Sequence, residues 1–426
     1  MIGRFLIHYK VTHITKPQSR KLRGIIVVSE VYYPDEQGTA YYITGLAEGL
    51  AEHYQLTVFC GYPAVTARGR KVLARETING VRVERSHGTT FNKDKLLLRL
   101  INLGSLSLFI FFKLLISVRK DDIVIVVNGP HPLTYLARLV CFFHNTRCIL
   151  RIDDVYPEVF IATGIIPEKS IIARCIRYIN TVLFRGMDRV VVLGRDMKAL
   201  AEKATKNGAN HIEIIHNWGD VDTVLPKDKA INPLLAQLGL KDRFVISCAG
   251  NMGRVQAIET MFGAINRIKN NADIHFVFVG SGSKRPWMER EIRTKKLLNV
   301  TLVDQRPRSD QINFLNACDL ALASLIRGMA GAGVPSRMYN VMAAGKPLIA
   351  IAEEESELSR VVREEQIGWV VEPDNPEKLA NVILEAYMKK EVLHNMGKRA
   401  RIAAEQKYSR GKIIQDYRGL LQSLDC

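Results

Sequence analysis

Short runs of β-branched and aliphatic residues alternate with helical stretches through almost the whole chain, and this alternation limits the possible folds more than any other feature. It begins at residue 24 with GIIVVSEVY and continues through QLTVFCGYP, DIVIVVNGP and MDRVVVLG. Such runs are typical of strands buried on both faces, and the stretches between them carry apolar residues at helical spacing. The order predicts an α/β fold with parallel, doubly wound sheets.

The pattern ends near residue 217 and starts again with RFVISCAGN, which predicts two domains. It then repeats through IHFVFVGSG, CDLALAS and GKPLIAIA. A chain of 426 residues is also too long for a single hydrophobic core. We expect a basic N-terminal tail at 1–23, a first domain at 24–218 and a second at 219–407.

Positive charge points to an anionic partner. The net formal charge is +17, and residues 66–120 carry twelve Lys or Arg against three acids. The same segment holds an apolar run from Leu100 to Val118, which is interrupted by Asn102, Ser105, Ser107 and Lys113. We favour a helix that covers a sheet or dips into an anionic membrane surface over a bilayer span. No nucleic-acid partner is expected, because aromatic-interleaved basic stretches and zinc-finger spacings are missing.

The sequence lacks the motifs of disulfide-bonded proteins, zinc sites and serine hydrolases. The seven Cys form no Cys-x-x-Cys pair, no His-x-x-x-His spacing occurs and no Gly-x-Ser-x-Gly elbow is present. Disulfide frameworks, zinc sites and serine catalysis are therefore poor interpretations, and a reducing cytosol fits best. The acids Asp220 and Asp222 lie between the domains, where we expect no metal.

Ligands of doubly wound sheets bind beyond the carboxyl ends of the strands, so the loops there should rim one cleft. In AGNMGR, Gly250 and Gly253 would let the backbone approach a phosphate and Arg254 would supply charge. Gly280 and Gly282 in FVGSG form a similar turn. An ordinary tight turn is the alternative at both places. The expected rim comprises 34–39, 128–132, 153–158, 250–254, 280–285, 304–307 and 331–337.

Two further segments carry candidate side chains. RIDDVYPE places Asp153, Asp154 and Glu158 at a strand end, where carboxylates can orient sugar hydroxyls or take a proton, although solvated loop acids are common. GVPSRMYNVMAAGKP predicts a short helix that starts near Arg337 with Ser336 as its N-cap, so that helix N–H groups and the guanidinium face a diphosphate. A plain loop-to-helix junction is the alternative.

Together these segments resemble the family 4 glycosyltransferases of the GT-B fold, in the branch that builds bacterial surface polysaccharides. The resemblance runs from about residue 24 to 420 and rests on the order of YYPDEQGTAYYITGLAEGLAEH, IDDVYPE, DRVVVLGRDM, IIHNWGD, AGNMGR, FVGSG, NVTLVDQRPRSD, CDLALASL and GVPSRMYNVMAAGKP. It implies two Rossmann-like domains facing across a cleft, with the final helix, 408–426, crossing back to the first.

The resemblance also implies an activity. The expected reaction is a retaining, metal-independent transfer of a hexose from a UDP- or GDP-linked donor, with no further cofactor. The first domain would bind a polyprenyl-linked or other saccharide acceptor and the second the nucleotide sugar. The leaving phosphate would accept the acceptor's proton. The protein would be cytoplasmic and peripheral on the inner face of the cytoplasmic membrane.

Family positions carry over residue by residue. The expected catalytic group is Asp153, Asp154, Glu158, Arg254 and Arg337, although family members often have a His at Asp153. A diphosphate Lys of the family is not recognisable, so Arg337 would supply its charge. The expected donor contacts are Gly38, Thr39, Gly250, Gly253, Gly280, Gly282, Gln305, Arg306, Gly333, Val334, Ser336 and Asn340.

One departure from the family pattern leaves a second class of function open. Two Glu residues of the family correspond to Ala332 and Asn340, and the second of them usually holds the nucleotide ribose. A catalytically degenerate scaffold or partner subunit is therefore the alternative. The preserved glycine loops, Arg254 and Arg337 favour an enzyme, because a scaffold has no use for a phosphate site.

Overall fold

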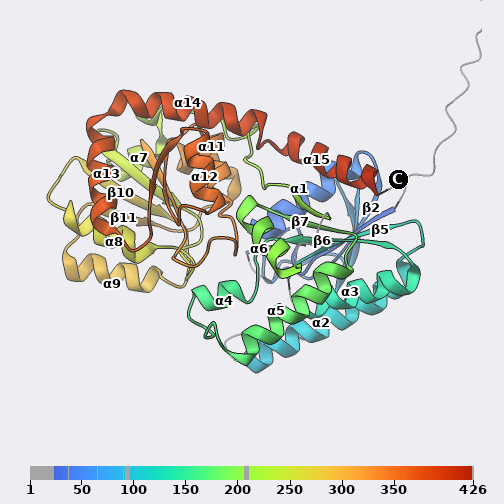
Figure 1. The fold of residues 1–426 in the computed structure, drawn as a ribbon. Coiled ribbons are helices and arrows are strands. Elements are labelled where there is room, and N and C mark those ends of the chain that lie inside the picture. Colours follow the sequence, from blue (N-terminus) through green and yellow to red (C-terminus); the bar gives the residue numbers. More distant parts are fainter. Residues whose placement is uncertain are drawn as a thin grey trace, which may run out of the picture.

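The computed structural model describes residues 24–36, 38–64, 66–89, 91, 96–129, 131–205 and 211–424, so the expected basic tail lies outside the described residues. Figure 1 shows two α/β domains side by side, each with a central sheet, linked by an extended crossing and by the run from α14 to α15. The α/β class and the two doubly wound sheets predicted from the alternation are confirmed.

The first domain is built on a sheet in which the described residues form eight strands, ordered β3-β4-β2-β1-β5-β6-β7-β8. Neighbouring strands are parallel except for the pair β3 and β4 at the edge. The direction of winding reverses between β1 and β5, which is where such sheets bind ligands. The strands are β1 Gly24–Val28, β2 Gln55–Gly61, β3 Arg75–Ile78, β4 Val81–Ser86, β5 Ile123–Val127, β6 Arg147–Ile152, β7 Arg189–Val192 and β8 Ile212–Ile214.

Helices cover both faces of this sheet. Alternate residues of β1 point to opposite sides, so Ile25 and Val27 join one core while Ile26 and Val28 join the other. Helices α1 (Gly38–Ala51) and α15 (Arg410–Ser423) lie over the first core. The second lies beneath α2 (Leu96–Ser117), α3 (His131–His144), α5 (Ile171–Gly186) and α6 (Arg195–Thr205), and the short α4 (Glu158–Ala162) follows β6.

The long apolar run forms α2 and covers the sheet, as the sequence favoured. Its inward residues Leu106, Ile110 and Leu114 recur every fourth position and are almost fully buried. Among the described residues, no helix combines the length and the apolar character that crossing a bilayer requires.

The second domain has a wholly parallel sheet with the strand order β11-β10-β9-β12-β13-β14, as the described residues define it. The winding reverses between β9 and β12. Its strands are β9 Phe244–Ala249, β10 Ile274–Val279, β11 Val300–Val303, β12 Leu320–Ser324, β13 Leu348–Ile351 and β14 Gly368–Val371. Its helices are η1 Lys229–Ile231, α7 Pro233–Leu238, α8 Ile258–Arg267, α9 Arg285–Lys295, η2 Arg308–Asp310, α10 Gln311–Asn316, α11 Arg337–Ala343, α12 Glu357–Glu364, α13 Pro376–Met388 and α14 Lys390–Gln406.

The chain crosses between the domains twice, and the two crossings lie against each other. The Gly219 N–H donates to the Tyr408 carbonyl at 2.9 Å. A Cβ at Gly219 would lie 2.3 Å from the Tyr339 carbonyl oxygen, so only glycine fits between these segments. Apolar residues of α15 then complete the core over α1, which confirms the expected return of the last helix.

A fully buried arginine, Arg151 at the end of β6, holds this junction together. Its Nε donates to Asp153 at 2.9 Å, its Nη1 to the Tyr417 hydroxyl at 2.9 Å and its Nη2 to Asn217 at 2.6 Å. The guanidinium therefore links the first sheet, the outgoing crossing and the returning helix.

We expect Tyr417→Phe to lower the free energy of unfolding by about 1–3 kcal/mol, because a buried Arg151 N–H would lose its acceptor. Thermal denaturation measures the change, with Tyr178→Phe as control because that side chain is exposed. Equal melting temperatures for Tyr417→Phe and wild type would contradict this role for the hydroxyl.

Candidate active site

The carboxyl ends of the two sheets meet at a junction between the domains. The segment after β6 pairs with the segment before α11, through a bridge between Asp154 and Gly333. The Val155 N–H donates to the Ala332 carbonyl at 2.7 Å. The segments containing the expected catalytic carboxylates and the expected donor contacts are therefore neighbours.

Three of the predicted glycines are required by close packing of two loops. Gly250, Gly280 and Gly282 have φ values of 120°, 142° and 153°, which favour glycine. A Cβ at Gly280 would lie 2.2 Å from the Gly250 carbonyl oxygen, and one at Gly282 would lie 2.4 Å from the Met252 carbonyl oxygen. The loops after β9 and β10 thus stack backbone on backbone, while Gly253 packs against the side chain of Asn251.

The two predicted arginines meet this glycine surface differently. Arg337 is anchored, because its Nη1 lies 3.2 Å from the Cys248 Sγ and its Nη2 donates to the Asn251 carbonyl at 2.7 Å. Its guanidinium lies beside Gly250 and keeps other N–H groups available. Arg254 is exposed, and no described residue forms a hydrogen bond or ion pair with its side chain. A fixed and an unpaired cation therefore belong to the same loop cluster.

Ser336 does not cap α11, and here the sequence prediction is wrong. The helix begins at Arg337 as expected, but Ser336 is itself helical (φ −60°, ψ −19°) and its side chain accepts no bond from the first turn. A capping side chain normally belongs to a residue with extended backbone. The helix has only seven residues, so its dipole contributes little. Gly333 and Val334, also predicted donor contacts, are buried in the turn before it.

Asn340 carries an unused acceptor. Its side chain is 8% exposed, and its Oδ1 is buried without a hydrogen-bond partner among the described residues. Such an orphan is uncommon, because leaving it unpaired costs about 1–3 kcal/mol. Ala332, at the other family Glu position, is fully buried and contributes its carbonyl to the domain junction.

The loop after β11 uses its side chains within the second domain. The Ser281 hydroxyl donates to the Gln305 Oε1 at 2.9 Å, and Arg306 forms an ion pair with Asp310. Gln305 is thereby held beside the glycine turn at 280–282. Because the side chains of Gln305 and Arg306 are already bonded within the second domain, the backbone groups of this loop are the ones left to contact a ligand.

The three predicted carboxylates have separate environments. Asp153 is bound to the buried Arg151, and Glu158 pairs with Arg177 at 2.8 Å on the next helix. Only Asp154 is exposed, with its carboxylate against the hydrogen of Gly333, where a Cβ would lie 2.8 Å away. Although part of this residue is exposed, protein atoms around its carboxyl group desolvate it, and this desolvation, together with the charge of Asp153, raises the pKa of Asp154 to about 6.

The N-terminus of α1 lies on the first-domain side of the junction, just after Glu36, whose carbonyl accepts a hydrogen bond from Arg308 of the second domain. The helix begins at Gly38, and a Cβ there would meet no atom within 4 Å, so open space faces this position. Thr39 follows with a half-buried side chain. This end of a 14-residue helix carries free N–H groups and partial positive charge.

The sequence analysis did not predict two contacts across the domain junction. The Arg308 guanidinium carbon lies 3.3 Å from the centroid of the Tyr41 ring, and its Nε donates to the Glu36 carbonyl at 3.2 Å. Burial raises the pKa of Tyr41 to about 12, which the Arg308 charge opposes. These residues lie in the segments YYPDEQGTAYYI and QRPRSD, which resemble the family, but neither segment indicates that the two would contact each other.

The second missed contact joins α6 to α12. Arg195 forms ion pairs with Glu357 at 2.9 Å and Glu364 at 2.7 Å. The buried Asp196 carboxylate accepts the N–H groups of Gly331 at 2.9 Å and Glu357 at 3.0 Å. Burial raises the pKa of Asp196, whereas these N–H groups lower it.

Comparison with known proteins decides the family. Residues 233–403 match the family described as glycosyl transferases group 1. The Pseudomonas aeruginosa protein "Probable glycosyltransferase WbjE" is 32% identical over 296 residues, which cover 68% of this chain and 72% of that protein. The chain belongs to the group 1 glycosyltransferases.

This glycosyltransferase has further relatives. The Escherichia coli K12 protein "Putative colanic acid biosynthesis glycosyl transferase WcaI" is 26% identical over 301 residues, covering 68% of this chain and 72% of that protein. The crystal structure of Anabaena Alr3699/HepE in complex with UDP and glucose superposes with a TM-score of 0.71 at 16% identity, over 94% of this chain and 100% of that chain. The expected GT-B fold is confirmed.

We expect Asp153→Ala to lower the free energy of unfolding by about 3–5 kcal/mol, because it leaves the buried Arg151 charge without its anion. Asp153→Asn should cost less, since an amide oxygen can still accept the Nε–H bond. Chemical denaturation measures both. An Asp153→Ala enzyme of wild-type stability that no longer transfers sugar would instead make Asp153 a catalytic residue.

Proposed function

We propose that this group 1 glycosyltransferase is a retaining enzyme that moves a hexose from a UDP- or GDP-linked donor to a lipid-linked saccharide or related acceptor at the inner face of the cytoplasmic membrane. One observation carries the proposal: Arg254 and Arg337 belong to a loop cluster of stacked glycines that faces the domain junction. The name of WcaI, which refers to the biosynthesis of colanic acid, supports polysaccharide biosynthesis as the setting.

The donor diphosphate would bind at the glycine cluster. Breaking the anomeric C–O bond develops negative charge on the departing phosphate, and preorganised donors stabilise that charge without reorganising. Arg337 is held by Cys248 and the Asn251 carbonyl, so it supplies a fixed charge, while the exposed Arg254 can move onto the phosphate. The N-terminus of α1 at Gly38 and Thr39 would face the same charge from the first domain. No step assigned to these groups requires a metal.

The nucleoside would extend along the second domain. The orphan Oδ1 of Asn340 is an acceptor suited to a ribose hydroxyl, in place of the family Glu. Because the amide is neutral, its bond should be weaker than one to a carboxylate. Backbone groups near Gln305 and Arg306 would hold the base. HepE binds UDP, which makes UDP the first nucleotide to test here.

The acceptor hydroxyl would meet Asp154. The residue is exposed and its carboxylate adjoins Gly333; desolvation raises the pKa of this carboxyl group to about 6, so it is mostly ionised at neutral pH. It can accept a hydrogen bond from an incoming hydroxyl and orient its oxygen toward the donor. In a retaining transfer the leaving phosphate takes the proton, so Asp154 acts by orientation. Closure of the domains excludes the water that would hydrolyse the donor.

A degenerate scaffold is the competing function, since neither family Glu is present at Ala332 or Asn340. Among the described residues, the buried Oδ1 of Asn340 and the exposed Arg254 side chain have no partner, and a scaffold would gain nothing from either. Both have a use if a nucleotide binds between them.

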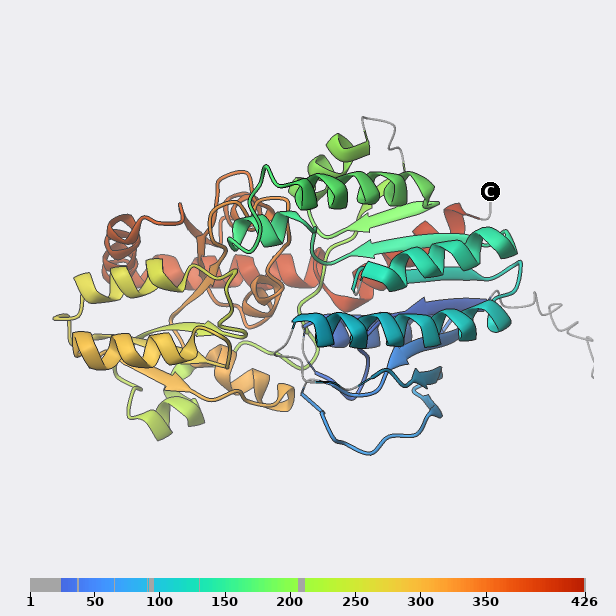
Figure 2. The same cartoon turned by 90° about the horizontal axis from the view of Figure 1, so that it is seen from below.

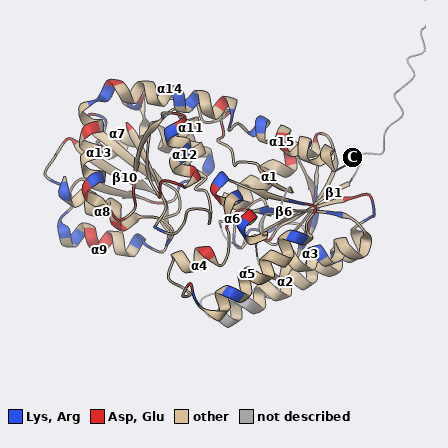
Figure 3. Cartoon of the chain, in the orientation of Figure 1, with Lys and Arg blue, Asp and Glu red and all other residues tan. Residues whose placement is uncertain are grey.

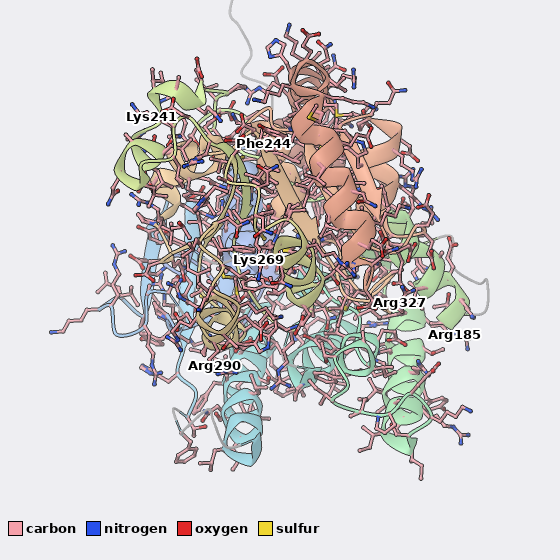
Figure 4. The ribbon with its side chains drawn as sticks, turned by 90° about the vertical axis from the view of Figure 1, so that its left-hand side faces the viewer. Arg185, Lys241, Phe244, Lys269, Arg290 and Arg327 are labelled. Atoms are coloured by element: carbon pink, nitrogen blue, oxygen red, sulfur yellow. The ribbon has the colours of Figure 1, made fainter. Side chains whose placement is uncertain are left out.

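Nucleotide binding tests the proposal directly. Calorimetric titration should detect UDP or GDP binding to wild type, and Arg254→Ala should weaken it about 10- to 100-fold through loss of a charged hydrogen bond. Asn340→Ala should weaken it about two- to tenfold through loss of a neutral one. Arg290→Ala is the matched control, because this exposed arginine of α9 lies on the second domain away from the first (Figure 4).

If neither UDP nor GDP binds at millimolar concentration, the proposal of an active glycosyltransferase fails and the degenerate scaffold takes its place. Unchanged binding by Asn340→Ala alone would remove only the ribose contact.

The pH dependence of transfer tests Asp154. Because the ionised form orients the acceptor, kcat/KM for the acceptor should fall about tenfold per unit below pH 6. Asp154→Asn should abolish this limb and lower the rate at neutral pH, whereas Glu158→Gln should keep the limb because Glu158 serves Arg177. An acidic limb near pH 6 that persists in Asp154→Asn would assign the titration to another group.

A further inference from the structure

Three helices of the first domain expose large apolar side chains on their outer faces. Among the described residues, five of these side chains belong to α2, three to α3 and five to α5. They are Ile101, Leu108, Phe109, Phe112, Ile116, Leu139, Phe142, Phe143, Ile171, Ile172, Tyr178, Ile179 and Val182, and each is more than 40% exposed. Patches of this kind on a soluble domain mark an interaction surface.

The three helices form one continuous surface, which we name the α2–α3–α5 face. Figure 2 views this side of the first domain and shows the helices next to one another over the sheet. The Tyr135 hydroxyl of α3 donates to the Asn180 Oδ1 of α5 at 3.2 Å. In Figure 4 the cyan α2 and the green α5 extend below the second domain, so that domain leaves their outer sides uncovered.

The three helices themselves carry charge of only one sign. The sequences of α2, α3 and α5 contain Lys and Arg but no Asp or Glu. Figure 3 accordingly colours these helices tan and blue. Arg174 and Arg185 are exposed beside the apolar stripe of α5, and Arg119 and Lys120 are exposed just beyond the end of α2.

We propose that the α2–α3–α5 face docks onto an anionic lipid bilayer, with its three helices parallel to the membrane surface. Phenylalanine, leucine and isoleucine side chains would enter the boundary between head groups and acyl chains, and the arginines would meet lipid phosphates. Tyr178 has the amphipathic ring that suits this depth. The sequence pointed to the basic segment 66–120, but α3 and α5 lie outside that segment.

Charge complementarity favours a bilayer over a second copy of the chain. In a two-fold dimer through this face, the same patch meets itself, and the three helices offer no Asp or Glu of their own to pair with the arginines. An anionic bilayer offers both an apolar phase and negative charge. The helical surface matches it in both respects.

The position of α2 explains why this face suits the reaction. The Thr89 hydroxyl donates to the Asn102 Oδ1 at 2.8 Å, which places the first half of α2 beside the carboxyl end of β4. A bilayer on this face would therefore lie next to the rim of the candidate active site. The inference rests on the proposed function for the lipid-linked acceptor, but its test measures lipid binding alone.

Vesicle flotation tests the face. Vesicles of phosphatidylcholine with about 30 mol% phosphatidylglycerol should carry wild type, and pure phosphatidylcholine should carry much less. The triple variant Phe112→Ser, Phe142→Ser, Tyr178→Ser removes one exposed ring from each helix and should reduce the bound fraction at least about tenfold. The control triple Ile231→Ser, Leu298→Ser, Met388→Ser removes apolar residues of the second domain that are even more exposed, and it should float like wild type.

A variant confined to α5, Ile171→Ser with Tyr178→Ser, should also reduce flotation, whereas neutralising Arg68, Arg70 and Lys71 with Gln should have a smaller effect. Calorimetry with UDP reports whether each variant retains the donor site, so failure of lipid binding and failure of the proposed function are separable. Wild-type flotation by the triple variant would overturn the proposal. So would a lipid-free dimer of wild type that the triple variant abolishes, because the face would then join two copies.

Discussion

A single buried guanidinium connects the parts on which the whole architecture depends. Burial alone would lower the pKa of Arg151, but Asp153 and Tyr417 more than offset this, so the group stays charged. Each of its three nitrogens has a partner, from the segment just after β6, the outgoing crossing and α15. A buried charge is tolerated only with such complete pairing. The returning helix is therefore fixed to the sheet by polar bonds as well as by the core over α1.

The same constraint shapes the candidate active site. Because Asp153 is committed to Arg151, the exposed carboxylate at the junction is its neighbour, Asp154. Asp153 also contributes to the raised pKa of that neighbour. Asp153, which has a structural role, and Asp154, the proposed acceptor contact, are thus adjacent after β6, and Asp154 is the more exposed of the two. Two polar contacts, from Arg195 with Asp196 and from Arg308, then set how the second domain faces them.

The proposed donor site combines rigid backbone with side chains that have spare bonding capacity. Stacked glycine loops hold the backbone at distances that a Cβ would prevent, so this surface is formed before any ligand arrives. Arg337 is fixed upon it, and the acceptor atom of Asn340 is buried and unused. Preorganisation of this kind is where electrostatic stabilisation is most effective. The α2–α3–α5 face, which we propose docks onto a bilayer, would bring this donor site to the lipid-linked acceptor that we also propose.

The sequence by itself determined the fold class and the family, because strand runs, helical spacing and glycine turns are local patterns. It also placed the start of α11 at Arg337. Only the tertiary structure decided which predicted residues were committed elsewhere: Asp153 to Arg151, and Glu158 to Arg177. The tertiary structure also decided that apolar side chains of α3 and α5 are exposed and that Arg308 contacts Glu36 and Tyr41. Partner choice and exposure depend on contacts between distant segments, such as Arg151 with Tyr417, 266 positions apart, and no local pattern encodes them.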